Sequence, residues 1–580
     1  MAAFYLTNQK NEALIEKAKC IFQKRGFNKA HIFETSCGTL LLYPKQMIDV
    51  DNYIQQGNKS LYCIGSPIYK GLSYYNSLKQ LINDLIDNSF THKDLFGEFV
   101  LLYDNGVSLT VITDTTGMYK LFTDAKKSQY LTSSFMAAAA SQPTTFNRIA
   151  IAEQFLYGFI AEPDTIVNEV CSIHGNIILD WLDYIPSYQY PKFTESISQE
   201  ASVERQVKCI ENYMKAAKSL TEEFGAECGL SGGCDSRLIY TAVNNSCTLL
   251  SSVHTHQTSH IHDNEISVVE KLAKLYSTPL NIVSTTYLPY CEPGEIERVL
   301  RENTYYFDAR NADTIGGMSQ THTRNYKKAT AKGNGVTFSG IGGEIYRDFY
   351  YTQMRSFDFK KWLITRIFDF GRARLFGDDL YKKTISNIIS KIEKATNIKL
   401  DKNANPIAAK RYFDCYRIPY ALSNVVHANN QMSFFLAPFT EAMMISAASS
   451  DSKYQDHCGL YEGRFIEFFN SKATSIPTSR GYNLTSIPQK VIDKWNKMSK
   501  YPYWVWRLRY ALNKSNSKSA DSHTSLLEKS RYYQTAYSFF RQLMPEYNDT
   551  PIRYGEVSLN SFVFSVCSIY EIELLNNNVE

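Results

Sequence analysis

One stretch, Glu227 to Val243 (ECGLSGGCDSRLIYTAV), most constrains what this chain can fold into. An apolar lead-in that includes Leu230 precedes the hexapeptide Ser231–Ser236, and the apolar residues after it have the 3.6-residue spacing of a buried helix face. The pattern predicts a strand, a tight loop and a helix. Gly232 and Gly233 allow a turn that a Cβ would block. Because a helix N-terminus offers free N–H groups and a partial positive charge, we expect an anion site at this loop.

Asp235 is the unusual member of this loop, because a carboxylate repels phosphate. It fits an anion site if it holds Mg2+, which bridges the carboxylate to the phosphates. Ser231 and Ser236 add hydroxyl donors. The alternative is a glycine–serine turn that only caps a helix, with Asp235 near the first helical position.

The six residues SGGCDS resemble the SGGxDS pyrophosphate loop of the N-type ATP pyrophosphatases. Within that group they are similar to the asparagine synthetase family, which includes β-lactam synthetases and lasso-peptide cyclases. The resemblance implies an enzyme that activates a carboxylate as an acyl-adenylate, releases pyrophosphate and lets an amine attack.

The same resemblance implies two domains of α+β and α/β type. Residues 1–195 would form a degenerate glutaminase-like, Ntn-type β-rich sandwich. Residues 200–580 would form an ATP-pyrophosphatase domain with a parallel sheet and a largely helical C-terminal part. A chain of 580 residues is long enough for two or more domains.

Composition narrows the functional class. Hydrophobic residues at 44% and charged residues at 21% are typical of an ordinary soluble globular protein. The net charge of +4 gives no reason to expect a nucleic-acid or membrane partner. The 12 cysteines include no CxxC pair, the first residues do not have the pattern of a signal peptide, and no run of about 18 apolar residues occurs. We therefore expect a cytoplasmic protein with reduced thiols.

The first third of the chain contains short alternating runs split by turn signals, which predict a β-rich domain with a few helices, such as 11–24 and 75–86. Segments 94–104 and 111–122 resemble the N-terminal domain of asparagine synthetases. Glutamine-using members of that family carry a nucleophilic Cys at the mature N-terminus, whereas Met1 here is followed by Ala2. The first cysteine, Cys20, is internal, so we expect Cys20 and Cys37 to be structural and the domain to act as a scaffold.

Strands and helices alternate around the loop. Helices at 204–223 and 266–276 and strands at 247–253 and 281–283 imply a parallel sheet. A ligand site is then expected at the carboxyl ends of the strands. By the resemblance, Leu230 and Val253 border the nucleoside.

Four histidines, at positions 254, 256, 260 and 262, follow the predicted second strand. They favour either a structural or substrate-facing loop or a zinc site. Asp263 and Glu265 resemble the acidic pair of the family, or they serve as a helix N-cap and a first-turn charge.

A second glycine-rich stretch runs from Gly335 to Glu344 (GVTFSGIGGE) and resembles the SGxGxD loop of the family. By that resemblance Ser339 and Gly340 contact the nucleotide, and Glu344, in place of the usual Asp, holds Mg2+. Ile341 stands where relatives often carry a Glu or Tyr that helps deprotonate the amine, and an isoleucine cannot transfer a proton. The alternative is a glycine turn beside a helix.

Several charged residues outside the two loops have more than one possible role. Asp308 and Arg310 either bind a substrate group or pair with each other on the surface, and Arg347 is a candidate to orient a phosphate or an acid. Segment 476–481 resembles one in which some relatives place a transition-state Lys. Arg480 is the nearest cation there, with Lys472 as the second candidate and a surface role as the alternative for both. Helices are predicted at 359–370, 378–395, 405–416 and 434–448.

These features predict an ATP- and Mg2+-dependent ligase that joins a carboxylate to an amine from a source other than glutamine, as in lactam or macrolactam closure. The substrate would be a small molecule or a peptide, with or without a partner protein that delivers it. Alternatives are an ammonia-using amidation of an amino acid or sugar acid, and an inactive nucleotide-binding paralogue. The predicted catalytic residues are Asp235, Glu344 and Arg480, the metal ligands Asp235 and Glu344, and the nucleotide-binding residues Leu230, Ser231, Gly232, Gly233, Asp235, Ser236, Val253, Ser339 and Gly340.

Overall fold

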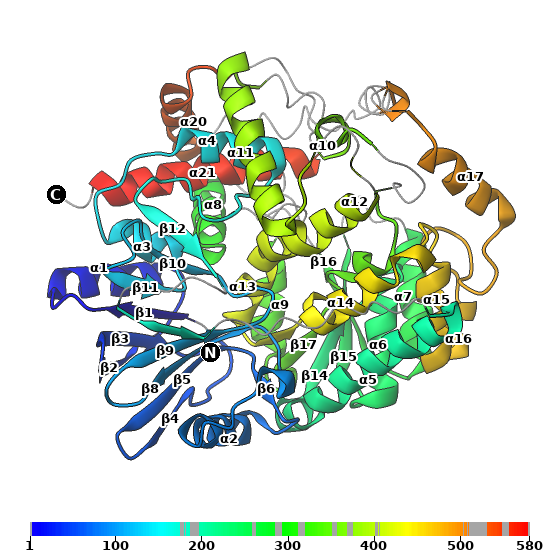
Figure 1. Ribbon diagram of the computed structural model, residues 1–580, viewed down its shortest axis with the longest axis horizontal. Coiled ribbons are helices and arrows are strands. Elements are labelled where there is room, and N and C mark those ends of the chain that lie inside the picture. The colour runs from blue at the N-terminus through cyan, green and yellow to red at the C-terminus, as the bar shows by residue number, and fades with distance from the viewer. Residues whose placement is uncertain are drawn as a thin grey trace.

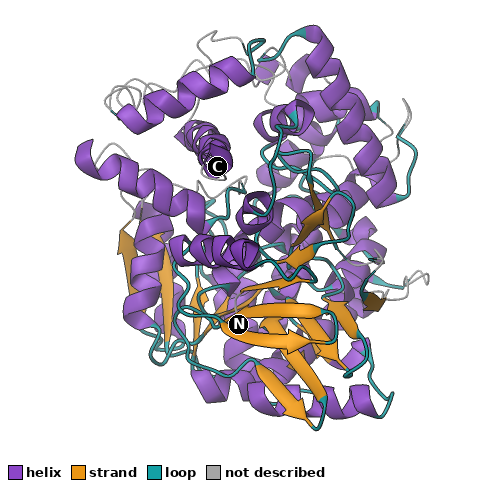
Figure 2. Cartoon of the chain, turned by 90° about the vertical axis from the view of Figure 1, so that its left-hand side faces the viewer, coloured by secondary structure: helices purple, strands orange, loops and turns teal. Residues whose placement is uncertain are grey.

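The computed structural model describes the chain except for residues 1–2, 175–178, 180, 186–196, 258–262, 285–292, 311–319, 351–356, 368–374, 401–403, 405, 503, 507, 510–529, 548–555 and 578–580. The fold is a mixture of helices and strands, with antiparallel pairing in the first 185 residues and a parallel sheet after them (Figures 1 and 2).

Two sheets form the N-terminal part. The six-stranded sheet has the order β12 (Val170–Ile173), β10 (Leu121–Asp124), β11 (Tyr130–Thr132), β1 (Ala3–Thr7), β3 (Gly38–Tyr43), β2 (His31–Thr35). The five-stranded sheet has the order β13 (Asp183–Ile185), β9 (Leu109–Thr113), β8 (Phe99–Asp104), β5 (Lys59–Gly65), β4 (Tyr53–Gln56). All their pairings are antiparallel except that of β13 with β9. β6 (Ile68–Tyr69) and β7 (Leu95–Phe96) form a separate pair.

Side chains on the two faces of these strands belong to two different hydrophobic cores. In β1, Phe4 and Leu6 join a cluster that also holds Val100 and Leu102 of the other sheet, so these side chains pack between the two sheets. Tyr5 points the other way and joins the main core. Because successive side chains of a strand face opposite sides, one strand serves both cores.

The helices of the N-terminal part are α1 (Glu12–Lys24), α2 (Tyr74–Ile86), α3 (Phe135–Ala140), α4 (Arg148–Tyr157) and the short 3-10 helix η1 (His92–Asp94). α2 packs on β4 and β5, α3 packs on β10 and β11, and α4 packs on helices from later in the chain. The predicted helices 11–24 and 75–86 are confirmed as α1 and α2. Asn11 is the N-cap of α1, and its side chain accepts hydrogen bonds from the amides of Ala13 and Leu14.

The parallel sheet has the order β16 (Leu280–Ser284), β15 (Ser252–Gln257), β14 (Ala226–Gly229), β17 (Val336–Phe338), β18 (Phe434–Leu436). All four pairings are parallel, as the sequence predicts. The strand predicted at 247–253 is misplaced, because β15 begins only at Ser252, after a turn that follows α6. The strand predicted at 281–283 is confirmed within β16.

Helices flank both faces of this sheet. α5 (Gln199–Phe224) and α6 (Asp235–Ser246) lie on one side of β14 and β17, with α14 (Ala442–Ser450) and α15 (Leu460–Phe469) packed on α5. α9 (Gln320–Thr330) and α13 (Ser423–Asn430) lie on the other side (Figure 1).

The helix predicted at 434–448 is wrong at its start. Residues 434–436 are strand β18, and a 3-10 turn, η7 (Pro438–Thr440), separates it from α14. The apolar run is short and Pro438 cannot donate a backbone hydrogen bond, so a strand at the sheet edge is favoured over a helix.

The remaining elements are mostly helical, as predicted. They are α7 (Asp263–Leu275), α8 (Pro293–Tyr306), η4 (Gly343–Tyr346), α10 (Phe359–Arg366), α11 (Asp378–Thr396), α12 (Pro406–Tyr412), the π-helix η6 (Phe413–Leu422), η8 (Ser452–Tyr454), α16 (Ser471–Ser475), α17 (Gln489–Ser499), α20 (Arg531–Leu543) and α21 (Glu556–Asn577). α21 contacts α3 and α4 of the N-terminal part as well as α8 and α20.

Asp308, just after α8, joins the N-terminal part to the rest of the chain. Its carboxylate accepts hydrogen bonds from the Ser134 hydroxyl (2.7 Å) and from the Phe135 and Met136 amides (2.6 and 3.1 Å), so it caps α3 from outside. The Arg25 guanidinium lies 3.3 Å from it. Asp308 is buried and its contact with Arg310 (3.9 Å) is internal, so the alternative of a surface pair is wrong.

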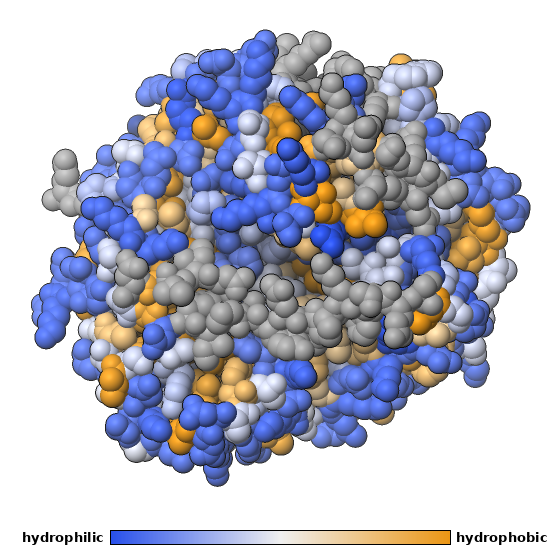
Figure 3. Space-filling model, in the orientation of Figure 1, coloured by the Kyte–Doolittle hydropathy of each residue, from blue (hydrophilic) through white to orange (hydrophobic). Residues whose placement is uncertain are grey.

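Hydrophilic side chains cover much of the face shown in Figure 3, with apolar groups scattered among them. Within the described ranges, no helix is long and apolar enough to cross a bilayer. The described cysteines form no disulfide; Cys20 is exposed on α1, and Cys37 is half-buried at the turn between β2 and β3.

We expect Asp308→Asn to lower the free energy of unfolding by about 3 kcal/mol, because it leaves the buried Arg25 without its counter-charge. Urea unfolding followed by tryptophan fluorescence measures the loss. Asp379→Asn is the matched control, since that side chain is 94% exposed. Equal midpoints for the two variants would contradict the role of Asp308.

Candidate functional site

Two loops meet at one edge of the parallel sheet. β14 leads into the loop Leu230–Cys234, and its neighbour β17 leads into the loop that starts at Ser339. Cys228 pairs in register with Phe338, so Gly229 and Ser339 lie at the same level of the sheet. The structure therefore brings the two glycine-rich stretches of the sequence together at the carboxyl ends of adjacent strands, where α/β proteins bind ligands.

The second loop packs directly on the first turn of α6, and two glycines make this possible. A Cβ at Gly340 would lie 2.6 Å from the backbone nitrogen of Ser236, and one at Gly343 would overlap the carboxylate of Asp235. Gly342, at φ +89°, turns the chain into η4. The absence of these side chains lets the two loops approach within van der Waals contact.

The SGG loop is held together by its own serines. The Ser231 amide donates to Ser236 Oγ (2.9 Å), the two hydroxyls lie 2.9 Å apart, and the Gly233 amide faces Ser231 Oγ at 3.3 Å. α6 begins at Asp235 without a side-chain cap, so its first N–H groups remain available to an anion.

Asp235 takes part in a cluster of charged groups from three elements. Arg347 Nη2 lies 2.5 Å from Asp235 Oδ2, and Arg347 Nε lies 3.8 Å from Glu462 Oε2 on α15. Glu462 is completely buried, and neither of its carboxylate oxygens accepts a hydrogen bond within the described part of the chain. Glu344, half-buried in η4, interacts with both Asp235 and Arg347.

The electrostatics of this cluster follow from burial and charge. Burial and then the negative charge of Asp235 raise the pKa of Glu344, and they raise that of Glu462 well above its usual range. Burial disfavours the charged form of Arg347, yet the carboxylates of Asp235, Glu462 and Glu344 raise its pKa. Three carboxyl groups therefore share the Arg347 guanidinium, Arg417 also acts on Glu344, and the raised pKa values favour the neutral forms of Glu344 and Glu462 in this conformation.

A carboxylate also contacts the anion loop itself. Glu265, in the first turn of α7, accepts a hydrogen bond from the Gly232 amide at 3.2 Å. Glu265 is therefore both a charge in the first turn of a helix and a contact of the loop, and the two interpretations of the acidic pair stay open. The Gly232 amide thus already faces a negatively charged group, as it would with a phosphate bound. The Asp235 carboxylate likewise already faces a positive charge, as it would with a cation bound.

Arg237 fixes a further segment against the loop, although the sequence analysis did not single it out. This fully buried side chain donates to the carbonyls of Ala473 (3.0 Å), Ile476 (2.6 Å) and Pro477 (3.1 Å). The Ser479 amide in turn donates to the Gly232 carbonyl at 3.0 Å. In the sequence, Arg237 stands in the apolar helix segment directly after SGGCDS. A charged residue at that place is the signal that could have predicted a buried anchor.

Arg480 lies at the border of the site. Its Nη1 donates to the His457 carbonyl at 3.1 Å, and its charge interacts with Arg347 and with Cys234, the neighbour of Asp235. The side chain is exposed and contacts no carboxylate of the cluster in the described residues. Lys472 is also exposed, in α16.

The predicted nucleoside contacts divide into two groups. Ser339 and Gly340 lie at the loop, where the Ile341 amide faces Ser339 Oγ at 3.3 Å. Leu230 and Val253 are buried. Val253 pairs with Cys228, one residue below the sheet edge, so its side chain belongs to the core in this conformation.

Of the four histidines that follow the loop in sequence, His254 and His256 lie within the described residues, in β15. His254 Nδ1 lies 3.4 Å from Glu227 Oε2, and Tyr326 and Thr337 donate to the same carboxylate. Burial alone would raise the pKa of Glu227, but His254 and its other partners lower it to about 2. His260 and His262 lie outside the described residues.

The donor set at Asp235 suits Mg2+. Asp235 Oδ1 is buried and accepts no hydrogen bond from the described residues. Mg2+ prefers oxygen ligands and in phosphate sites usually takes one or two carboxylates together with phosphate oxygens. No group of three or more His, Cys, Asp or Glu side chains in the described ranges is arranged to hold a metal alone, so Asp235 and Glu344 would need phosphate oxygens to complete the shell.

Comparison with known proteins adds no family assignment. The chain matches no protein-family model, and the search of curated proteins finds no significant match.

We expect Gly343→Ala to lower the free energy of unfolding by about 2 kcal/mol, because the added methyl group displaces Asp235 or η4. Gly377→Ala is the control, since its added methyl group would meet nothing nearer than 3.7 Å. Thermal unfolding of both variants measures the difference. A Gly343→Ala protein as stable as Gly377→Ala would contradict the close packing of the two loops.

Proposed function

We propose that the chain is an ATP-dependent, AMP-forming carbon–nitrogen ligase. It would adenylate a substrate carboxylate, release pyrophosphate and join the acyl group to an amine. The observation that carries the proposal is the contact of the Ser339–Glu344 loop with Asp235 and Ser236 at the carboxyl ends of β14 and β17. This is the arrangement that the two motifs require if both are to contact one nucleotide.

The phosphates fit the SGG loop. The loop offers the amides of Ser231 to Gly233, which now donate to Ser236, Glu265 and Ser231, together with the serine hydroxyls and the uncapped N-terminus of α6. Ser339 and Gly340 would contact the nucleoside or the α-phosphate from the second loop. Mg2+, when bound to Asp235 and Glu344, would neutralise charge on the phosphates.

Binding would exchange internal partners for ligand. A phosphate oxygen would replace Glu265 on the Gly232 amide. A cation on Asp235 would replace the positive charge that Arg347 now supplies. Arg347 would then be free to pair with Glu462 or with the α-phosphate, where negative charge develops during adenylation.

The amine donor is proposed to lie on the substrate itself or on a second substrate. Cys20 lies within α1 and Cys37 in a turn, so neither has an α-amine of its own to act as a base. An amine on the substrate itself would make the reaction the closure of a lactam or macrolactam ring in a small molecule or peptide. Direct use of ammonia is the alternative. Under this proposal residues 1–195 form a glutaminase-like scaffold domain, and residues 200–580 form the ligase domain.

Calorimetry with the nonhydrolysable analogue α,β-methylene-ATP and Mg2+ tests the nucleotide site. Wild-type protein should bind, and Asp235→Ala should weaken binding by roughly 100-fold, about 2.7 kcal/mol. Glu344→Gln should weaken it in the same direction, because both changes remove a Mg2+ ligand. Asp379→Ala, at an exposed acid, should bind as wild type does.

The outcomes separate the candidate functions. Equal binding by wild type and Asp235→Ala, or no binding by wild type, would contradict the proposal. Binding without pyrophosphate release across a panel of carboxylates would favour the inactive nucleotide-binding paralogue.

A further inference from the structure

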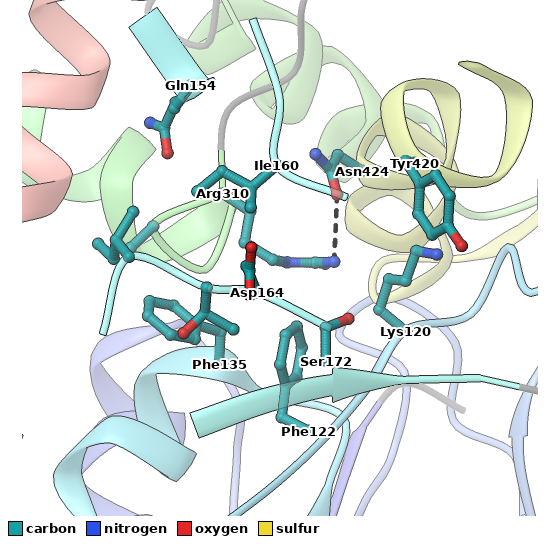
Figure 4. Close-up of a pocket in the computed structure, with 13 residues that line it drawn as sticks. Lys120, Phe122, Phe135, Gln154, Ile160, Asp164, Ser172, Arg310, Tyr420 and Asn424 are labelled. Carbon is teal, nitrogen blue, oxygen red and sulfur yellow. Dashed lines mark hydrogen bonds between the residues drawn. The ribbon is translucent and has the colours of Figure 1, made fainter. Parts of the chain in front are cut away.

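A cavity lies away from the loops, between the N-terminal sheets and the helical part that contains η6 (Figure 4). Its volume is about 50 Å³. That volume holds about four water molecules, so only a small ligand fits. The lining residues come from β10 and the residue before it, α3, α4 and the segment after it, β12, the turn after α8, and η6 with the start of α13: Lys120, Phe122, Phe135, Gln154, Ile160, Asp164, Thr165, Ile166, Ser172, Ala309, Arg310, Tyr420 and Asn424.

Lys120 is the exceptional member of this lining. Its side chain is only 4% exposed, and its ammonium group makes no hydrogen bond to any described residue. The contacts are a 3.7 Å separation from Glu162 and a position 4.6 Å from the centre of the Tyr420 ring. Its backbone is fixed, since its amide donates to His427 Nδ1 at 3.2 Å. A buried ammonium with unused donors is costly unless something fills them.

Arg310 supplies the second cation. Figure 4 shows its side chain extended across the cavity, with Nη1 donating to Asn424 Oδ1 at 3.2 Å. Its Nε has no hydrogen-bond partner among the described residues and lies 3.9 Å from Asp308. Burial lowers the pKa of Lys120 to about 8; the charge of Glu162 opposes this shift and that of Arg310 adds to it.

The acids nearby each face a cation. Asp164, the acid that lines the cavity, lies 2.7 Å from Lys391 and accepts from Asn387 (2.9 Å). Glu162 pairs with His174 through Oε2 at 2.8 Å, and its Oε1 faces Lys120 at 3.7 Å. Asp308 caps α3 and pairs with Arg25. Lys120 Nζ and Arg310 Nε nevertheless remain donors without a hydrogen-bond partner among the described residues.

We propose that this cavity binds a small oxyanion, either inorganic phosphate or a short carboxylate, held between Lys120 and Arg310. Its oxygens would accept from the Lys120 ammonium and the Arg310 guanidinium, with the Ser172 hydroxyl and the Gln154 amide at the cavity wall. The site uses no residue of the two loops and is independent of the proposed ligase function.

Titration calorimetry with inorganic phosphate, acetate and malonate, each added separately to the full chain, tests the site. Wild type should bind at least one of them saturably, and Lys120→Met should weaken that binding at least tenfold. Lys126→Met is the matched control, because it removes the same charge from an exposed position and should bind as wild type does. The preferred anion tells a tetrahedral oxyanion from a carboxylate.

A change that keeps the charge serves as the second variant. Ser172→Val replaces a hydroxyl at the cavity wall with a larger apolar group, so it should also weaken binding at least tenfold. Urea unfolding checks that each variant folds; Lys120→Met should be less stable than wild type but still folded, because it removes a cation that lies 3.7 Å from the buried Glu162. No saturable binding by wild type, or binding by folded Lys120→Met equal to that of Lys126→Met, would overturn the proposal.

Discussion

The contact between Gly343 and Asp235 is the constraint on which the rest of the site depends. Parallel pairing of β14 with β17 sets the two loops side by side, but only a residue without a Cβ lets them close on each other. Once closed, the second loop fixes the carboxylate that opens α6 and carries Glu344 and Arg347 to the same place. Sheet register, loop composition and charge placement are thus linked through one steric requirement.

In the described conformation, charged side chains of the protein itself pair with the groups that would bind the ligand. Arg347 lies against Asp235, and Glu265 accepts from the Gly232 amide. Without Arg347 the half-buried Asp235 carboxylate would lack a counter-charge, and without Glu265 the Gly232 amide would lack a hydrogen-bond partner. A ligand that brings both a cation and an anion replaces both partners at once, so the cation and the anion should bind cooperatively.

Local sequence predicted the loops well, because glycine spacing and an apolar helix face act within a few residues. The parallel order around β14 also followed from alternating elements. Glu462, more than 200 residues from Asp235 in sequence, carried no local signal, since a Glu in an amphipathic helix is normally exposed. The helix predicted at 434–448 failed because a short apolar run fits a buried strand equally well.

A crystal structure with α,β-methylene-ATP and Mn2+ in place of Mg2+ tests the central claim most directly, because the anomalous signal of manganese locates the cation. We expect Mn2+ on the carboxylate of Asp235, phosphate oxygens on the amides of Ser231 to Gly233, and Arg347 displaced from Asp235. A nucleotide bound elsewhere, with the Arg347–Asp235 ion pair intact, would contradict the assignment of the two loops as the nucleotide site.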